Sequence, residues 1–207
     1  MRASAPQRLV YLHGFRSSPR SFKARLLAER LAGLGLAERF ACPQLPASPA
    51  AAVDLILDEI APGPDDTLVG SSLGGHYATW LAERSGCRAV LLNPAVFPAR
   101  DLAAHTGAQR MYHSDDEFVF GPRYLDELAQ LEVGAPSRLQ RYLLIAAKGD
   151  ELLDWREMVA KYRGAPTILL EGGDHGLSEF APLVDRVLAF AGMVGGPIDS
   201  NPPAEQT

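Results

Sequence analysis

Ser72 lies in a sequence pattern that predicts nucleophilic catalysis. It is the central residue of Gly70-Ser71-Ser72-Leu73-Gly74, which fits G-x-S-x-G, between an apolar segment and an amphipathic one. This setting predicts a sharp strand-to-helix turn in which bulky side chains two residues before and after the serine would collide. The turn would present the hydroxyl at a helix N-terminus, where N–H groups stabilise developing negative charge. The alternative is that Ser71 or Ser72 is an ordinary helix N-cap.

A nucleophilic serine needs a base, and the base needs an acid that orients it. Asp150 follows the apolar segment Tyr142–Ala146, and His175 follows the apolar segment Thr167–Leu170. The chain order serine, aspartate, histidine is that of α/β-hydrolases. Because parallel strands end at a common edge of their sheet, we expect Ser72, Asp150 and His175 to meet there.

Two other carboxylates compete with Asp150 for the role of the acid. Asp154 lies four residues further along the chain, and Asp174 directly precedes His175. Both fit ordinary roles in a loop or at a helix cap. We favour Asp150 because it comes at the end of a predicted strand.

The oxyanion of a tetrahedral intermediate needs two hydrogen-bond donors. We expect these to be the main-chain N–H groups of Leu73, directly after the serine, and of Phe15, after the first apolar segment. His13 is predicted to shape the loop of Phe15. His76 lies one helical turn past Ser72 and is predicted to point away from the hydroxyl.

The elements that position these residues alternate between strands and helices. Apolar runs without polar alternation predict strands buried on both faces, as in a parallel sheet. Alternating strands and helices predict an α/β fold with an open, mostly parallel, doubly wound sheet of about six strands. The predicted strands are Leu9–Leu12, Arg39–Cys42, Thr67–Val69, Ala89–Leu92, Tyr142–Ala146 and Thr167–Leu170. The predicted helices cover about 18–31, 53–60, 73–85, 155–162 and 177–190.

The segment between Asn93 and Arg141 is longer than a plain crossover requires. We expect an insertion over about 94–140 with two short helices, near 99–105 and 123–131, around the acidic and aromatic run 114–120. Such excursions often act as lids or binding loops, although an ordinary helix pair would also fit. Its apolar side chains are candidates for one wall of a substrate pocket: Phe97, Tyr112, Phe118 and Phe120.

Composition excludes several classes of protein. The chain has 207 residues and a formal net charge of −5, which argues against a general nucleic-acid binder. The length predicts a single domain over residues 1–194, with a Gly/Pro-rich flexible tail over 195–207. Two cysteines and no signal-peptide pattern favour a cytoplasmic protein without a membrane partner. The spacing of His, Cys, Asp and Glu indicates no metal site, and we expect no cofactor.

Five motifs in order resemble the YqiA-like small bacterial esterases of the α/β-hydrolase superfamily, over about residues 8–190. The resemblance implies a compact hydrolase with Ser72, Asp150 and His175 as its triad, acting on esters, with acyl-CoA thioesters as a further candidate substrate class. His76 and Leu177 depart from the family, which usually has aromatic residues there. The matching motifs are Tyr11-Leu-His-Gly-Phe15 continuing to Lys23-Ala24, Gly70-Ser-Ser-Leu-Gly-Gly75 with Tyr77-Ala78, Asn93-Pro-Ala-Val96, Gly149-Asp-Glu151 with Leu153-Asp154, and Gly172-Gly173 with His175.

The sequence therefore predicts a serine hydrolase that cleaves a small-molecule carboxylic ester or thioester. Two alternatives stay open: another reaction of this fold, such as C–C bond hydrolysis, and a non-catalytic binding protein. The first would use the same triad, so only substrate screening separates it. The second would usually lack a triad member.

Overall fold

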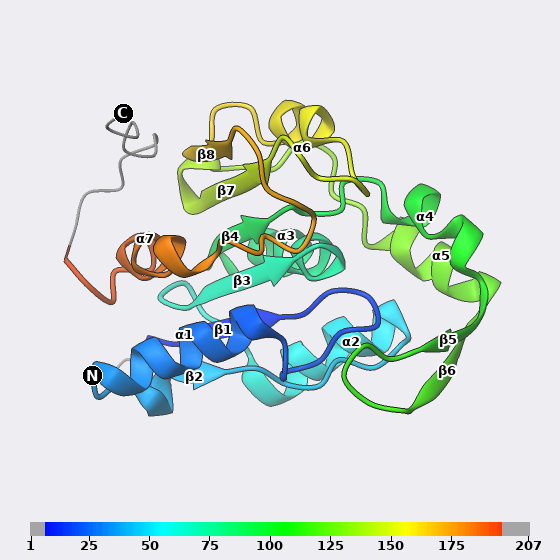
Figure 1. Ribbon diagram of the computed structural model, residues 1–207, viewed down its shortest axis with the longest axis horizontal. Coiled ribbons are helices and arrows are strands. Elements are labelled where there is room, and N and C mark those ends of the chain that lie inside the picture. Colours follow the sequence, from blue (N-terminus) through cyan, green and yellow to red (C-terminus); the bar gives the residue numbers. More distant parts are fainter. Residues whose placement is uncertain (1–6, 196–207) are drawn as a thin grey trace.

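The computed structural model describes residues 7–195 and contains an open sheet of parallel strands with helices on both faces (Figure 1). The strands of this sheet are β1 (Leu9–Leu12), β2 (Phe40–Ala41), β3 (Thr67–Ser71), β4 (Arg88–Leu92), β7 (Tyr142–Ala147) and β8 (Thr167–Leu170). The α-helices are α1 (Phe22–Gly33), α2 (Pro49–Leu55), α3 (Leu73–Ser85), α4 (Pro98–Asp101), α5 (Pro122–Gln130), α6 (Trp155–Lys161) and α7 (Val184–Phe190). The predicted fold class is confirmed.

The strands of the sheet are buried on both faces, as the continuous apolar runs predict. Within β7, Leu143 and Ile145 pack toward α1 and α7, whereas Leu144 and Ala146 pack toward α2, α3 and α6. The two apolar clusters therefore lie on opposite faces of one sheet, and alternate residues of each strand belong to different clusters. Figure 1 shows α1 and α7 in front of the sheet and α3 behind it.

The strand order is β2-β1-β3-β4-β7-β8. From β1 the chain adds β2 on one side and then β3 and the later strands on the other side, so the sheet has a switch point between β1 and β3. At such a switch point the loops after two neighbouring strands turn to opposite faces and leave a crevice at the carboxyl edge, where open α/β sheets bind ligands. The loop that contains Phe15 follows β1, and Ser72 follows β3. The topology thus places the predicted nucleophile and one predicted oxyanion donor side by side.

The insertion differs from its prediction in one respect. The two short helical regions are present, as α4 with a following 3-10 turn (Ala103–His105) and as α5. Between them lies an antiparallel hairpin of β5 (Gly107–Arg110) and β6 (Glu117–Phe120), which had not been predicted. The two strands are short and half-exposed, so they lack the continuous apolar runs that mark the main sheet.

Two predicted helices begin later than expected. The helix predicted from residue 18 begins at Phe22, because Ser18 to Ser21 form a turn in which Ser21 N–H donates to Ser18 O (3.1 Å). The helix predicted from residue 177 begins as a 3-10 turn at Ala181 and becomes α7 at Val184. Leu177 has a φ of 52°, which no right-handed helix accommodates. The predicted tail, apart from residue 195, lies outside the described residues.

Candidate active site

Ser72 occupies a strained turn between β3 and α3. Its φ of 54° and ψ of −119° lie in a region that residues other than glycine rarely adopt. A Cβ at Gly70 would lie 2.3 Å from the carbonyl oxygen of Gly74, and a Cβ at Gly74 would lie 2.0 Å from that of Leu12. Only glycine fits at these two positions, and this is the physical reason for the two glycines of the G-x-S-x-G pattern.

The side chains of Ser72, His175 and Asp150 form one chain of contacts. His175 Nε2 lies 2.9 Å from Ser72 Oγ, and His175 Nδ1 lies 2.9 Å from Asp150 Oδ2. These are the two hydrogen bonds that a serine, a base and an orienting acid require. The three residues come from the ends of β3, β7 and β8, so the parallel sheet brings them together at one edge as expected.

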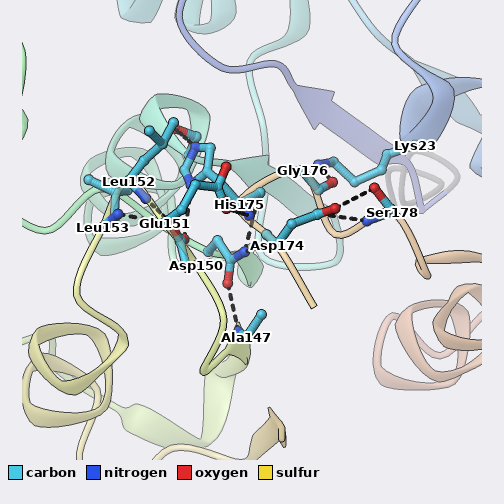
Figure 2. A network of polar contacts seen from close by, with 12 residues as sticks. Lys23, Ala147, Asp150, Glu151, Leu152, Leu153, Asp174, His175, Gly176 and Ser178 are labelled. Carbon is cyan, nitrogen blue, oxygen red and sulfur yellow. Dashed lines mark hydrogen bonds and ion pairs between the residues drawn. The ribbon is translucent and has the colours of Figure 1, made fainter. Parts of the chain in front are cut away.

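The Asp150 carboxylate is held in place from both sides. Its side chain has no exposed surface, and its Oδ1 accepts the main-chain N–H groups of Leu152 (2.9 Å) and Leu153 (2.8 Å), as Figure 2 shows. These two bonds occupy one carboxylate oxygen and leave the other for His175. Hydrogen bonds of this kind fix the orientation of the carboxylate toward the imidazole, where it can stabilise an imidazolium.

The rival carboxylates have other partners. Asp154 is the N-cap of α6, where its Oδ1 accepts the main-chain N–H of Arg156 at 2.9 Å. Asp174 accepts the main-chain N–H and the hydroxyl of Ser178, at 3.0 and 2.6 Å, and the hydroxyl bond lowers the pKa of Asp174. The geometry therefore favours Asp150 as the partner of the histidine.

Asn93, at the end of β4, connects the loops that contain the acid and the base, and no role had been predicted for it. Its side chain is fully buried, and its Nδ2 donates to the carbonyl oxygens of Asp174 (3.0 Å) and His175 (3.1 Å). Its Oδ1 accepts the N–H of Ala147, the last residue of β7, at 2.8 Å. The sequence contained a signal, since Asn93 begins one of the motifs shared with the esterase family.

Glu151 and Gly149 hold the same two loops together. Glu151 Oε2 accepts the main-chain N–H of His175 at 2.9 Å. A Cβ at Gly149 would lie 2.2 Å from the carbonyl oxygen of Gly173, so the loops after β7 and β8 touch through their backbones. The contact requires glycine at position 149.

The two expected oxyanion donors are free to bind a ligand. Leu73 is the first residue of α3, and Phe15 lies in the turn after β1. Within residues 7–195, neither main-chain N–H donates to a protein acceptor. The two loops are close, because a Cβ at Gly14 would lie 3.2 Å from Ser72 Cβ. The oxyanion role of these N–H groups stays a prediction that this placement supports.

A cavity of about 450 Å³ contains Ser72 and His175 in its lining. Tyr112 contributes to its wall, whereas Phe97, Phe118 and Phe120 do not. Phe118 lines a neighbouring cavity of about 470 Å³, which also contains Phe15 in its lining. Phe120 is fully buried and packs its ring against Phe15, with 5.0 Å between centroids. Of the four predicted wall residues, only Tyr112 lines the cavity that contains Ser72.

The other histidines near the site have structural partners. His13 Nε2 accepts the main-chain N–H of Leu45 at 3.0 Å, so His13 shapes its loop. His76, a residue of α3, is buried, with its Nε2 3.2 Å from the carbonyl oxygen of Leu128. Among residues 7–195, no three His, Cys, Asp or Glu side chains gather as a metal site would require.

The parallel sheet, the crevice at its switch point and the serine on a strand-to-helix turn define an α/β-hydrolase fold. Residues 8–192 match the family described as "Uncharacterised protein family (UPF0227)", and the chain belongs to that family. The predicted membership of the YqiA-like family and of the α/β-hydrolase superfamily is thereby confirmed.

Solved structures of α/β hydrolases superpose on most of the chain. Alpha/beta hydrolase domain-containing protein 10 from mouse has 18% identity and a TM-score of 0.67, covering 91% of each chain. Est1E from Butyrivibrio proteoclasticus, solved with ferulic acid bound, has 14% identity and a TM-score of 0.67, covering 91% of this chain and 89% of that one. A pyrethroid hydrolase from Sphingobium faniae JZ-2 has 15% identity and a TM-score of 0.59, covering 90% and 97%. At these identities the likeness concerns the fold.

None of the helices in residues 7–195 has the length and apolar character needed to cross a bilayer.

Cys42 and Cys87 are both free thiols, and burial raises the pKa of Cys42 to about 12 and that of Cys87 to about 11. Such thiols are protonated at neutral pH, so neither is suited to act as a nucleophile.

Proposed function

We propose that this protein is a cytoplasmic serine hydrolase that cleaves small-molecule carboxylic esters through an acyl-enzyme intermediate. The observation that carries the proposal is the unbroken chain of contacts from Ser72 Oγ through His175 to a buried Asp150. Its acid end is fixed by two main-chain N–H groups, and its serine end opens into a cavity.

In the first half of the reaction, Ser72 Oγ attacks the carbonyl carbon of the ester while His175 Nε2 takes the hydroxyl proton. Asp150 stabilises the imidazolium without taking the proton itself. The negative charge moves to the carbonyl oxygen, which the N–H groups of Phe15 and Leu73 bind. The tetrahedral intermediate then collapses, the bond to the alcohol oxygen breaks, and His175 gives its proton to that oxygen.

The second half repeats these steps with water. His175 removes a proton from water as the oxygen attacks the acyl carbon, and the same two N–H groups bind the second oxyanion. The bond between the acyl carbon and Ser72 Oγ breaks, and the proton returns to the serine. A thioester would form the same acyl-enzyme with a thiol as the leaving group, so acyl-CoA thioesters belong to the proposed substrate class.

The proposal is tested by hydrolysis of p-nitrophenyl butyrate with a matched pair of acid variants. Asp150→Asn is expected to lower kcat by about 10³–10⁴-fold, because the amide would hold the imidazole in the wrong tautomer. Asp154→Asn makes the same change four residues further along the chain, at the N-cap of α6. Asparagine also caps helices well, so this variant is expected to keep kcat within about threefold of the wild type. A large loss from Asp154→Asn together with full activity of Asp150→Asn would overturn the assignment of the acid.

A further inference from the structure

Lys23 is a buried cation in the wall of the serine cavity. It lies in the first turn of α1, is 6% exposed, and lines the cavity that also contains Ser72 and His175. Its Nζ donates to the carbonyl oxygen of Gly176, next to the histidine, as Figure 2 shows. An ammonium has three protons to donate, and this carbonyl accepts one of them.

The charge of Lys23 has no counter-ion in direct contact. Within residues 7–195 no carboxylate lies within ion-pair distance of its Nζ. Asp174 and Asp150 act on it only from further away, and burial outweighs them, so that the pKa of Lys23 falls to about 8. The only other group near the ammonium among the described residues is the ring of Phe22, with 5.3 Å between Nζ and the ring centroid. A buried charge without a counter-ion is costly, which indicates that something else completes the site.

Ser21 is a second unsatisfied polar group in the same wall. It is the N-cap residue of α1, yet its side chain makes no capping hydrogen bond. The residue is 8% exposed, and its Oγ is buried without a hydrogen-bond partner among the described residues. The phenol of Tyr11, which also lines the cavity, is near enough for the Ser21 hydroxyl to offset part of the rise that burial causes in the pKa of Tyr11, although no hydrogen bond of ordinary length joins them. A serine at this position usually caps the helix N-terminus. The uncapped hydroxyl of Ser21 lies just beneath the cavity surface, and a rotation about its χ1 would present it to a ligand.

We propose that Lys23 and Ser21 form a subsite for a carboxylate that the ester substrate carries in addition to its scissile bond. The ammonium would bind one carboxylate oxygen and the Ser21 hydroxyl the other, at the positive end of α1. Because these groups share one cavity with Ser72, the anion belongs to the same molecule as the ester. The inference rests on the proposed ester hydrolysis and narrows its substrate class to anionic esters.

The competing explanation is that Lys23 only ties α1 to the loop of His175. That role would require the bond to Gly176 but not the hydroxyl of Ser21. Loss of this tie would also lower kcat/KM for charged and neutral esters alike. The two explanations therefore differ in the ratio of kcat/KM for an anionic ester to kcat/KM for its neutral counterpart.

The test uses pairs of esters that differ only in the carboxylate. For a carboxylate on the acyl side, p-nitrophenyl monoesters of dicarboxylic acids from succinate to sebacate are compared with p-nitrophenyl esters of the corresponding monocarboxylic acids. For a carboxylate on the alcohol side, the butyrate ester of p-hydroxyphenylacetate is compared with that of p-cresol. We expect the wild-type protein to prefer the anionic member in one of these two arms.

Lys23→Met and Ser21→Ala are each expected to lower that preference by about tenfold or more, as the loss of a hydrogen bond to a charged group predicts. Lys148→Met is the matched control, because it removes the same charge from a lysine that pairs with Glu171 outside the cavity. It is expected to keep the ratio. Hydrolysis of the neutral esters reports whether the Lys23→Met protein is folded. If the Lys23→Met protein is not folded, the Ser21→Ala variant provides the test, since this change leaves the contact between Lys23 and Gly176 intact.

Calorimetric binding of the same pairs to the Ser72→Ala protein separates this inference from the proposed function. Tighter binding of the anionic member that Lys23→Met abolishes would support the subsite even if the wild type hydrolysed no ester. Hydrolysis without any preference for the anionic member, or with a preference that neither Lys23→Met nor Ser21→Ala alters, would overturn the subsite and leave the proposed function standing.

Discussion

The amide nitrogen of Asn93 donates a hydrogen bond to the carbonyl oxygen of His175 at 3.1 Å. The same side chain accepts the N–H of Ala147, three residues before Asp150. One buried residue at the end of β4 therefore fixes the backbones on which both the base and the acid stand. The distance between the imidazole and the carboxylate depends on a residue that touches neither group.

Removal of this residue should loosen the site. Asn93→Ala leaves the carbonyl oxygen of His175 and the N–H of Ala147 without a partner, while the carbonyl oxygen of Asp174 keeps its bond from the Leu177 N–H. We therefore expect it to lower the free energy of unfolding by about 2–4 kcal/mol. We expect kcat for p-nitrophenyl butyrate to fall by at least about tenfold. Asn93→Asp keeps the acceptor but loses the donor, and should therefore also lose activity. Wild-type kcat in both variants would show that the carbonyl contacts do not position the histidine.

The close contact between Gly149 and Gly173 gives a second prediction. Gly149→Ala places a methyl group where only 2.2 Å separates it from the carbonyl oxygen of Gly173, so the loops of the acid and base must move apart. We expect kcat to fall by about tenfold or more, because small misplacements of catalytic groups are costly. Gly172→Ala is the control, since its Cβ would meet nothing within 4 Å. Equal activities of the two variants would contradict the prediction.

The strained backbone of Ser72 predicts that glycine is more favourable than alanine at this position. Glycine adopts a φ of 54° readily, whereas alanine does not. We expect Ser72→Gly to be more stable than Ser72→Ala by about 1 kcal/mol in urea denaturation, with both variants inactive. If Ser72→Ala were the more stable of the two, the turn would not be strained in solution.

His76 predicts how stability depends on pH. Burial lowers its pKa from 6.5 to about 4, so between these values the unfolded chain binds a proton that the folded chain does not. The free energy of unfolding therefore falls as the pH decreases through this range, by about 2 kcal/mol between about pH 7 and about pH 5. We expect the free energy of unfolding of His76→Phe, measured by urea denaturation, to decrease less than that of the wild type over this pH range. Some loss should remain, because the pKa values of His13 and His113 are also lowered.

A change at an exposed histidine provides the control for this measurement. His105→Phe should retain the dependence of the wild type on pH, since His105 is an exposed residue of the insertion. If His76→Phe and His105→Phe lost the same stability on acidification, protonation of His76 would not be the cause.

Much of the site could be predicted because its parts are local. The turn at Ser72 depends on two glycines whose spacing is fixed by sterics within one turn, and Asp150 and His175 directly follow apolar strands. The choice between Asp150 and Asp154 needed the structure, because both follow the same strand. Only the start of α6 shows that Asp154 is its N-cap.

The parts that could not be predicted depend on contacts between distant segments. The hairpin of β5 and β6 has half-exposed strands, although Phe118 and Phe120 at alternate positions carried a weak signal. The wall of the cavity was predicted from apolar residues of the insertion. The structure instead buries Phe120 against Phe15 and adds Ser21 and Lys23 from α1.

The central claim is that Ser72 is the nucleophile, and peptide mass spectrometry after treatment with a fluorophosphonate tests it most directly. The reagent phosphonylates a serine only where a base activates it and an oxyanion site binds its oxygen. We expect one adduct, on the peptide that contains Ser72, which disappears in Ser72→Ala and is strongly reduced in Asp150→Asn. An unmodified Ser72 in the folded wild-type protein, or equal labelling of Ser72→Ala, would contradict it.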